Sequence, residues 1–501
     1  MKRSSKINSA QGIILAGMQS GSGKTATTCL ILSALRQRGV SIQPFKVGPD
    51  FLDPQYHRHF AGKPSRNLDS WLMGKPGVVR EVEKAGADCL GIVEGVMGFF
   101  DGSDVRSDEG STFEISKELN WPVILIVPAA KAGRSIAASI RGFIDQAGKG
   151  KIQGLIFSGV SGESHADYLS EAVASLKIPI LGAIPTLPEL RWPERHLGLQ
   201  ALSELDLPSW KKLAKVAEKY LKVDEILSFN GRGELRESNV FRPLDDIQSI
   251  HPSYHSLASH PLQEVPERPK IKSSTRHFTT ISHAGLAELI SPVRRKTTHR
   301  IAIARDEAFH FYYEGNLATL EDEGVEWVPF SPLHDKSLPS SIDGVVLGGG
   351  FPEVFAPQLS KNRPMRGSFA KAIQSGLPCY AECGGLMWLS QEMMTLDGKK
   401  HPMVGLLPGR VEMTPRLQNF GYCTCVTSNG IQVKGHEFHH SRWIGESKNA
   451  NLWRVTRKRD QSSRMEGYRY KNLHASYIHL DWCAAKKILK PLFEKPRKSK
   501  L

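Results

Sequence analysis

The sequence predicts an α/β fold with two blocks of mostly parallel strands covered by helices. Short apolar runs alternate with helical stretches over 11–227 and again over 299–490. Parallel strands that are buried on both faces read as such continuous apolar runs. Between the blocks the pattern gives way to Pro, Ser and His with scattered charge, so 228–298 is predicted to be a linker or an insertion.

The predicted strands follow one another at short intervals in each block. The helix expected after the first of them, TATTCLILSALRQRG, ends at Gly39, a residue type that often closes helices. The runs of the first block are GIILAG, SIQPFKVG, CLGIVEG, PVILIVP, GLIFSGV and PILGAIP, and those of the second include RIAIA, VVLGGG and PCYAECGG.

Length and composition agree with an ordinary globular chain. The 501 residues suggest about two to four domains at ~150 residues each. The hydrophobic fraction is 40% and the charged fraction 23%, as in typical globular domains. No membrane span or signal sequence is expected, because the first apolar run is far too short. The seven cysteines have no paired or metal-binding spacing, which favours a reducing cytoplasm.

The net charge of +15 suits a polyanionic partner. No zinc finger, recognition helix or aromatic RNA-binding signature accompanies the basic residues, so a nucleic-acid partner is disfavoured. A small molecule that carries many carboxylates fits the same charge.

The stretch LAGMQSGSGKTATT, residues 15–28, is predicted to be a phosphate-binding loop, because it lies between an expected strand and an expected helix. It is one residue longer than the standard pattern, with Met18 where the first glycine usually stands. Backbone N–H groups and a helix N-terminus cradle phosphates, a lysine adds charge, and a hydroxyl can ligate Mg²⁺. The predicted nucleotide-binding residues are Gly17, Ser20, Gly21, Ser22, Gly23, Lys24 and Thr25.

Acidic residues follow several strands of the first block. Glu94 ends CLGIVEG, Asp50 and Asp53 follow another strand, and Asp101 lies in GFFDG. A single acid there caps a helix as readily as it does chemistry. Several acids near the carboxyl edge of one sheet point to a ligand, because open α/β folds bind ligands there. Mg²⁺ ligands are predicted to be Thr25, Asp50 and Glu94.

The stretch GLPCYAECGGLMWLS predicts a nucleophilic thiol. It reads as a strand, then Cys383, then a Gly-Gly turn into a helix, and such a turn projects a nucleophile clear of its backbone. The helix N-terminus favours the thiolate. Cys379, inside the strand, is expected to be buried and inert. Backbone amides of Gly349, Gly350 and Gly384 are predicted to stabilise an oxyanion.

The base that activates this thiol is expected far along the chain, as in other nucleophile–histidine pairs. His479 in LHASYIHLDW is the candidate, and Asp481 stands two residues later. We interpret Asp481 either as the acid that orients His479 or as a plain surface acid.

Several of these motifs resemble one known family. GMQSGSGKT, PFKVGPDFLDPQYH, PSRNLDSWL, IVEGVMGFFDG and PERHLGL are similar to the N-terminal domain of cobyrinate a,c-diamide synthases. Their longer loop is similar to that of dethiobiotin synthetase, which implies a P-loop NTPase-like domain over 11–227. GGGFPE, AECGGLMWL, GHEFHHSR and ASYIHLDW resemble the cobalamin-pathway branch of class I glutamine amidotransferases, which implies a flavodoxin-like domain over 299–490.

The resemblance implies an activity. The family uses ATP, Mg²⁺ and glutamine to amidate the a- and c-acetate groups of cobyrinic acid through an acyl phosphate. It implies Cys383 as nucleophile and His479 as its activating partner. The residues that would manage Mg²⁺ and the phosphorylated carboxylate are Asp50, Glu94 and Asp101, and those that would contact the tetrapyrrole polycarboxylate are Arg195 and His196. A homodimer is compatible with the sequence.

Alternatives stay open at this point. The same reaction on hydrogenobyrinic acid or nickel-sirohydrochlorin is the nearest one. A partitioning-type ATPase that binds DNA is disfavoured, because it has no use for Cys383 and His479. Two departures from the family pattern bear on nucleotide preference: Ser158 stands where the family usually has Asn, and Pro128 where Asp is usual.

Overall fold

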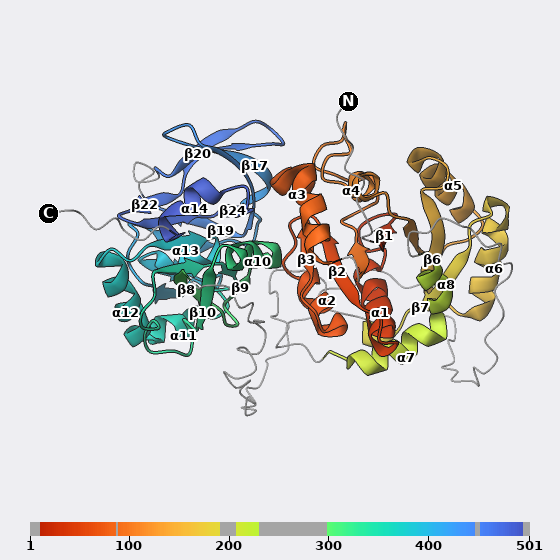
Figure 1. Cartoon of the computed structure of the whole chain (residues 1–501), viewed down its shortest axis with the longest axis horizontal. Coiled ribbons are helices and arrows are strands. Elements are labelled where there is room, and N and C mark those ends of the chain that lie inside the picture. The colour runs from red at the N-terminus through yellow and green to blue at the C-terminus, as the bar shows by residue number, and fades with distance from the viewer. Residues whose placement is uncertain (1–10, 87–88, 191–206, 230–297, 446–450, 494–501) are drawn as a thin grey trace, which may run out of the picture. The chain divides into compact units, whose positions relative to one another are not determined.

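The computed structural model describes residues 11–86, 89–190, 207–229, 298–445 and 451–493, with side chains up to 489 (Figure 1). The N-terminal and C-terminal parts each build a parallel sheet with its own buried core. The predicted α/β class is therefore confirmed. Among the described helices, none is both long and apolar enough to cross a lipid bilayer.

The N-terminal sheet contains seven described strands in the order β3-β2-β4-β1-β5-β6-β7. All of its pairings are parallel. This is the P-loop type of sheet that the sequence predicted. Its strands are β1 (Gln11–Gly17), β2 (Ile42–Val47), β3 (Arg66–Leu68), β4 (Leu90–Glu94), β5 (Val123–Pro128), β6 (Ile152–Val160) and β7 (Ile180–Pro185).

Helices cover both faces of this sheet, and Figure 1 shows them on either side of its strands. Ile14 and Ala16 of β1 point into one core, whereas Ile13 and Leu15 point into the other, as the period of two in a strand requires. The helices are α1 (Lys24–Gln37), α2 (Asp53–Ala61), α3 (Ser70–Lys84), α4 (Thr112–Leu119), α5 (Ile136–Ala147), α6 (Glu163–Val173), α7 (Trp210–Tyr220) and α8 (Val223–Ser228), with short 3₁₀ turns at Ala174–Leu176 and Pro188–Leu190.

The main C-terminal sheet has the described order β10-β8-β11-β13-β23-β22. Its first five strands are parallel, and β22 is added antiparallel at the edge. Counted along the chain, the parallel strands follow the flavodoxin-like order 2-1-3-4-5, as expected. The strands are β8 (His299–Ala304), β10 (Val325–Phe330), β11 (Gly344–Leu347), β13 (Cys379–Glu382), β22 (Tyr468–Tyr470) and β23 (Leu473–Ser476).

Smaller elements complete the C-terminal part. The described helices are α10 (Glu314–Asp322), α11 (Ala356–Lys361), α12 (Arg363–Gln374), α13 (Gly384–Leu389) and α14 (Lys486–Phe493). Three further sheets are formed by β9 (Phe309–Phe311) with β12 (Gly349–Gly350); by β14 (Glu392–Met394), β15 (Lys400–Pro402), β16 (Arg410–Met413) and β19 (Ser441–Ile444); and by β17 (Asn419–Thr427), β18 (Gln432–His439), β20 (Trp453–Arg457), β21 (Ser463–Glu466) and β24 (His479–Leu480).

Two glycines make room for the largest side chain of the N-terminal core. Gly12 of β1 pairs with Gly91 of β4, and a Cβ at either position would overlap the Trp121 ring. The Trp121 ring is 5% exposed and meets Phe45 edge-on at 6.4 Å. The close approach of this ring to the backbone of β1 and β4 therefore depends on both glycines.

This packing predicts a stability effect. Gly12→Val should lower the free energy of unfolding by about 1–3 kcal/mol, because overpacking forces side chains or backbone to shift. Urea unfolding followed by circular dichroism measures the effect. Gly142→Ala, in exposed α5 where a Cβ has open space, is the matched control and should stabilise by about 0.5–1 kcal/mol. Equal stabilities of the Gly12→Val variant and the wild type would contradict the packing role.

Candidate active site

The predicted phosphate loop lies between β1 and α1, at the carboxyl end of a central strand. Gly21 and Gly23 have φ values of 74° and 82°, which favour glycine. Ser22 Oγ accepts from the backbone N–H of Gln19 at 3.0 Å and donates to its carbonyl at 2.5 Å. The loop therefore has the left-handed turns and internal support that a phosphate cradle needs.

Lys24 folds back along this loop. Its ammonium donates to the carbonyls of Gln19 at 3.2 Å and Met97 at 2.5 Å. A Cβ on Gly17 would lie 3.0 Å from the Lys24 side chain, so glycine at this position lets the lysine pass. Gly17 and Lys24, both predicted from the sequence, thus come together at one end of the loop.

Thr25 and Glu94 form the acidic side of the site. Thr25 Oγ1 donates to Glu94 Oε1 at 2.7 Å, and His57 Nε2 lies 2.6 Å from Glu94 Oε2. The other ring nitrogen of His57 contacts Ser65 Oγ at 3.0 Å. Burial raises the pKa of Glu94, but Lys46, His57 and Thr25 outweigh burial and lower this pKa to about 2. Glu94 is therefore ionised at neutral pH.

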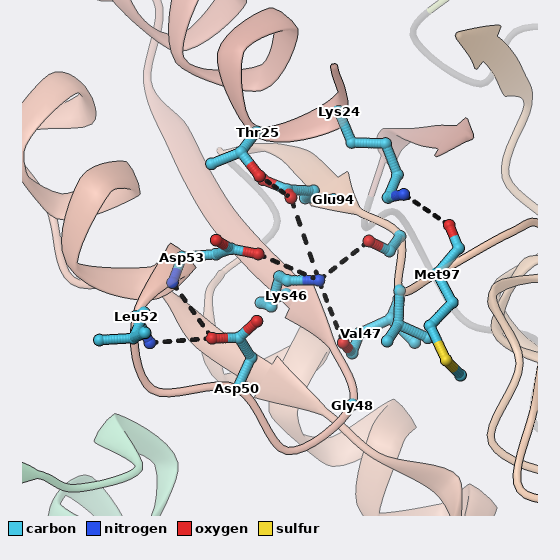
Figure 2. Close-up of polar contacts among 12 residues, drawn as sticks. Lys24, Thr25, Lys46, Val47, Gly48, Asp50, Leu52, Asp53, Glu94 and Met97 are labelled. Carbon is cyan, nitrogen blue, oxygen red and sulfur yellow. Dashed lines mark hydrogen bonds and ion pairs between the residues drawn. The ribbon is translucent and has the colours of Figure 1, made fainter. Parts of the chain in front are cut away.

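Lys46 is the buried cation that balances the acids (Figure 2). It is 2% exposed, and its Nζ lies 3.5 Å from Asp53 Oδ2 and 4.0 Å from Glu94 Oε1. The ammonium also donates to the carbonyl of Gly95 at 2.9 Å. Burying a charge is tolerated when it is paired in this way.

Sequence reasoning assigned no role to Lys46 or His57. Both lie within PFKVGPDFLDPQYH, but only the acids of this motif were included in the predicted site. A lysine inside a predicted apolar strand indicates a buried ion pair, because lysine is almost never fully buried without a partner. Lys46 could have been recognised in this way.

Asp50 and Asp101, two further predicted acids, accept hydrogen bonds from nearby backbone N–H groups. Asp50 Oδ1 accepts from the backbone N–H groups of Leu52 at 2.8 Å and Asp53 at 3.2 Å, just before α2. Asp101 Oδ2 accepts from the backbone N–H of Gly98 at 2.8 Å and so supports the loop after β4. Thr25 and Glu94 are joined directly, whereas Asp50 and Asp101 are tied to their own loops.

The oxygen donors present fit Mg²⁺ chemically. Among the described residues no group of three or more His, Cys, Asp and Glu side chains could hold a metal ion. Mg²⁺ usually keeps several waters and takes one or two carboxylates together with phosphate oxygens. The Thr25 hydroxyl and the Glu94 carboxylate could provide such a partial set of ligands.

Three further expectations concern substrate and base recognition. Arg195 and His196 lie outside the described residues. Ser158 of β6 pairs with Pro128 of β5, and a Cβ on Gly23 would overlap Ser158 Oγ. Ser158 therefore lies directly against the phosphate loop.

Cys383 occupies a strained turn between β13 and α13. It has φ 47° and ψ −104°, a conformation that non-glycine residues adopt where the surrounding structure enforces it. Its backbone N–H donates to Ser476 at 2.7 Å, and Gly385 donates to Gly348 at 3.0 Å. The expected nucleophile turn is present. Cys379 is 1% exposed inside β13, and burial raises the pKa of its thiol, in line with its predicted inertness.

The predicted oxyanion glycines lie close to one another and to His479. A Cβ on Gly384 would lie 3.2 Å from the backbone nitrogen of Gly350, and one on Gly349 would lie 2.7 Å from His479 Cε1. Larger side chains would therefore displace either the loop or the imidazole. The structure thus brings the three glycines together with Cys383 and His479.

His479 is paired with the thiol. Burial lowers the pKa of His479, but the Cys383 thiolate, a hydrogen bond to Cys383 and the Glu382 carboxylate outweigh burial and raise this pKa to about 10. Its Nδ1 lies 3.2 Å from Glu382 Oε2. The imidazole therefore stays protonated beside Cys383 at neutral pH.

The expectation that Asp481 orients His479 is corrected by the structure. Asp481 Oδ1 accepts from the backbone N–H of Ala484 at 2.8 Å and so caps the turn after β24. Nδ1 of His479 faces Glu382 instead. His479 belongs to β24, whereas Asp481 lies just beyond its end, where the chain turns and the carboxylate serves that turn.

A second histidine stacks on the first. His436 of β18 lies with its ring centroid 5.0 Å from that of His479 and nearly parallel to it. Its Nε2 is 2.5 Å from the Tyr313 hydroxyl. Burial and the positive charge of His479 lower the pKa of His436 well below its usual value, so His436 is neutral at physiological pH.

Comparison with known domains defines the class of protein. Residues 13–199 match the CobQ/CobB/MinD/ParA nucleotide binding domain, and residues 300–486 match the CobB/CobQ-like glutamine amidotransferase domain. The phosphate loop lies in the first match, and the Cys383–His479 pair lies in the second. The chain is therefore a nucleotide-binding ligase with a glutamine amidotransferase domain.

Relatives narrow the class to one family. Three proteins named cobyrinate a,c-diamide synthase are similar along nearly the whole chain. The one from Listeria innocua is 35% identical over 497 residues, which cover 96% of this chain and 98% of the relative. Those from Priestia megaterium and a Synechococcus species are 36% and 37% identical; they cover 97% and 93% of this chain and 97% and 94% of their own lengths. The chain belongs to the cobyrinate a,c-diamide synthase family.

The contacts of Glu94 predict how metal-dependent nucleotide binding responds to mutation. His57→Ala should weaken the apparent affinity for Mg²⁺ by about 10–100-fold, because the residue that fixes a metal-binding carboxylate is lost. Calorimetric titration of ATP at several Mg²⁺ concentrations measures this effect. His59→Ala, two residues on and exposed, is the control and should bind as the wild type does. Indistinguishable behaviour of the two variants would contradict the role of His57.

Proposed function

We propose that this chain amidates the a- and c-acetate carboxylates of cobyrinic acid, with energy from ATP and nitrogen from glutamine, in cobalamin biosynthesis. One observation carries the proposal. A phosphate loop joined to the Thr25–Glu94 pair and a Cys383–His479 pair occur in one chain whose relatives bear this enzyme's name over nearly their full lengths.

The nucleotide domain has the task of activating the acid. A carboxylate does not form an amide with ammonia at neutral pH, because it is a poor electrophile. Transfer of the γ-phosphoryl group of ATP to a carboxylate oxygen makes an acyl phosphate, and ammonia then displaces phosphate from its carbonyl carbon. Lys24, whose ammonium lies along the phosphate loop, is our candidate for neutralising charge on the transferred group. Thr25 and Glu94 would hold Mg²⁺, which supplies further neutralisation of phosphate charge.

The glutaminase domain supplies the ammonia. The Cys383 thiolate attacks the side-chain amide carbon of glutamine, and His479 gives a proton to the departing nitrogen. Water then hydrolyses the thioester to glutamate and restores the thiol. Backbone N–H groups of Gly349, Gly350 and Gly384 are our candidates for stabilising the tetrahedral oxyanion, because these glycines lie around the thiol and the imidazole.

The names of the relatives favour cobyrinic acid over the alternatives. Hydrogenobyrinic acid and nickel-sirohydrochlorin stay the competing substrates in the test below. Arg195 and His196 remain the proposed contacts for the ring carboxylates. The homodimer, the cytoplasmic location and the bounds 11–227, 228–298 and 299–490 also stay predictions.

Replacing the thiol separates the two half-reactions. Cys383→Ser should abolish glutamine-supported amidation and leave ammonia-supported amidation intact, because external ammonia bypasses the thioester. Amide formation and glutamate release are measured with each nitrogen source. Cys379→Ser, at a buried cysteine four residues earlier, is the control and should retain both activities. Loss of both activities in Cys383→Ser would mean that Cys383 is structural.

The substrate is tested by direct incubation. ATP, Mg²⁺ and glutamine are supplied with cobyrinic acid, hydrogenobyrinic acid or nickel-sirohydrochlorin, and mass spectrometry follows amide formation. Two amides should form on cobyrinic acid, with ADP and glutamate released in equal amounts. Faster turnover of either other tetrapyrrole would reassign the substrate, while leaving the amidoligase chemistry in place.

A further inference from the structure

The catalytic imidazole has an acidic neighbour that sequence spacing did not suggest. Glu382 immediately precedes the nucleophile, and its Oε2 lies 3.2 Å from His479 Nδ1. It is 4% exposed at the end of β13. The acid two residues after the histidine, Asp481, is engaged with Ala484 instead.

Three donors hold the Glu382 carboxylate in place through its other oxygen. Oε1 accepts from the Tyr380 hydroxyl at 2.6 Å, the Trp482 indole N–H at 2.9 Å and the Leu480 backbone N–H at 3.3 Å. Rotating the carboxylate away from His479 would break all three hydrogen bonds. Glu382 and His479 are both buried, so these hydrogen bonds keep Oε2 directed toward the imidazole.

We propose that Glu382 is the positioning residue that fixes the orientation and tautomer of His479 for the thiol of Cys383. An ionised carboxylate only accepts hydrogen bonds, so Nδ1 must carry a proton and Nε2 is left to face the sulfur. This role rests on the proposed glutaminase activity and adds a third member to the Cys383–His479 pair.

The surrounding charges agree with this role. Among the described residues, the titratable groups that face His479 are the Cys383 thiol, the Glu382 carboxylate and the His436 ring, and the Phe51 ring also packs against it. His436 acts against protonation of His479. A charge on His479 lowers the pKa of His436, and a charge on His436 would likewise lower the pKa of His479. Glu382 is the only carboxylate hydrogen-bonded to His479 among the described residues, so it stabilises the protonated imidazole beside Cys383.

Glu382→Gln alters the contact with His479 Nδ1 and keeps nearly the same side-chain shape. The glutamine oxygen can take the place of Oε1 and keep the three donors satisfied, which puts the amide N–H₂ group against Nδ1. An N–H₂ group forces Nδ1 to accept, so the proton moves to Nε2 and the wrong tautomer faces Cys383. In the serine-protease triad, the corresponding acid-to-amide change lowers kcat by about 10⁴.

The experiment compares glutamine hydrolysis and Cys383 alkylation across pH in the full chain. Glu382→Gln should lower kcat for hydrolysis by at least about a hundredfold, with a small change in KM. Ammonia-supported amidation should be unchanged, which shows that the protein is folded. The pH profile of Cys383 alkylation by iodoacetamide, localised by mass spectrometry, should differ from that of the wild type, because a neutral amide no longer supports a protonated imidazole beside the thiol.

Two controls separate positioning from structural support. Glu466→Gln removes another buried carboxylate that accepts from a tryptophan indole, Trp453, and a hydroxyl, Ser476. It should lower stability and leave the pH profile of Cys383 alkylation unchanged. Asp481→Asn tests the competing acid and should leave the profile unchanged as well.

A second variant decides the matter if Glu382→Gln does not fold. Tyr380→Phe keeps the carboxylate and removes one hydrogen bond that fixes it, so kcat should fall by a smaller factor in the same direction. If Glu382→Gln folds and shows the wild-type kcat and alkylation profile, the proposal is overturned. If only Tyr380→Phe folds, the same result in that variant overturns it. A drop in Asp481→Asn instead would also overturn it. Glutamine hydrolysis that persists in Cys383→Ser would overturn the proposed function itself. This outcome therefore distinguishes failure of the proposed function from failure of the role of Glu382.

Discussion

Buried carboxylates that are held by specific partners are the constraint on which both reactive centres depend. Glu94 is completely buried, and Lys46, His57 and Thr25 surround it. Glu382 is nearly as buried and meets His479 together with a cluster of hydrogen-bond donors. An unpaired charge in such surroundings is very costly. Glu94 is therefore ionised only because its partners are in place, and Glu382 is held in place by its hydrogen bonds.

The parallel sheets explain why the residues of each site lie close together. In both domains the functional loops follow the carboxyl ends of neighbouring strands, where the chain leaves the sheet. The phosphate loop follows β1 and Glu94 ends its neighbour β4. Cys383 follows β13, the Gly348–Gly350 run follows β11, and these strands are also neighbours. Residues far apart in the chain thus meet at one edge of each sheet.

The two centres use charge in opposite ways. At Glu94, partners lower the carboxylate pKa, so that the acid retains its negative charge where phosphate and a divalent cation would meet. At His479, the neighbouring Cys383 and Glu382 raise the imidazole pKa, so that the ring retains a proton, which in the proposed reaction passes to the nitrogen that leaves glutamine. Both arrangements require burial, since water would screen the interactions that hold them.

The sequence by itself determined the α/β class, the two blocks of strands, the phosphate loop and the Cys383–His479 pair. These features depend on short motifs whose chemistry needs particular residue types in one local order. The tertiary structure decided the partners: Lys46 and His57 for Glu94, and Glu382 in place of Asp481 for His479. The spacing along the chain favoured Asp481, but the turn after β24 carries its carboxylate to Ala484. Which side chains meet across a sheet depends on strand order and register, and no local pattern encodes these.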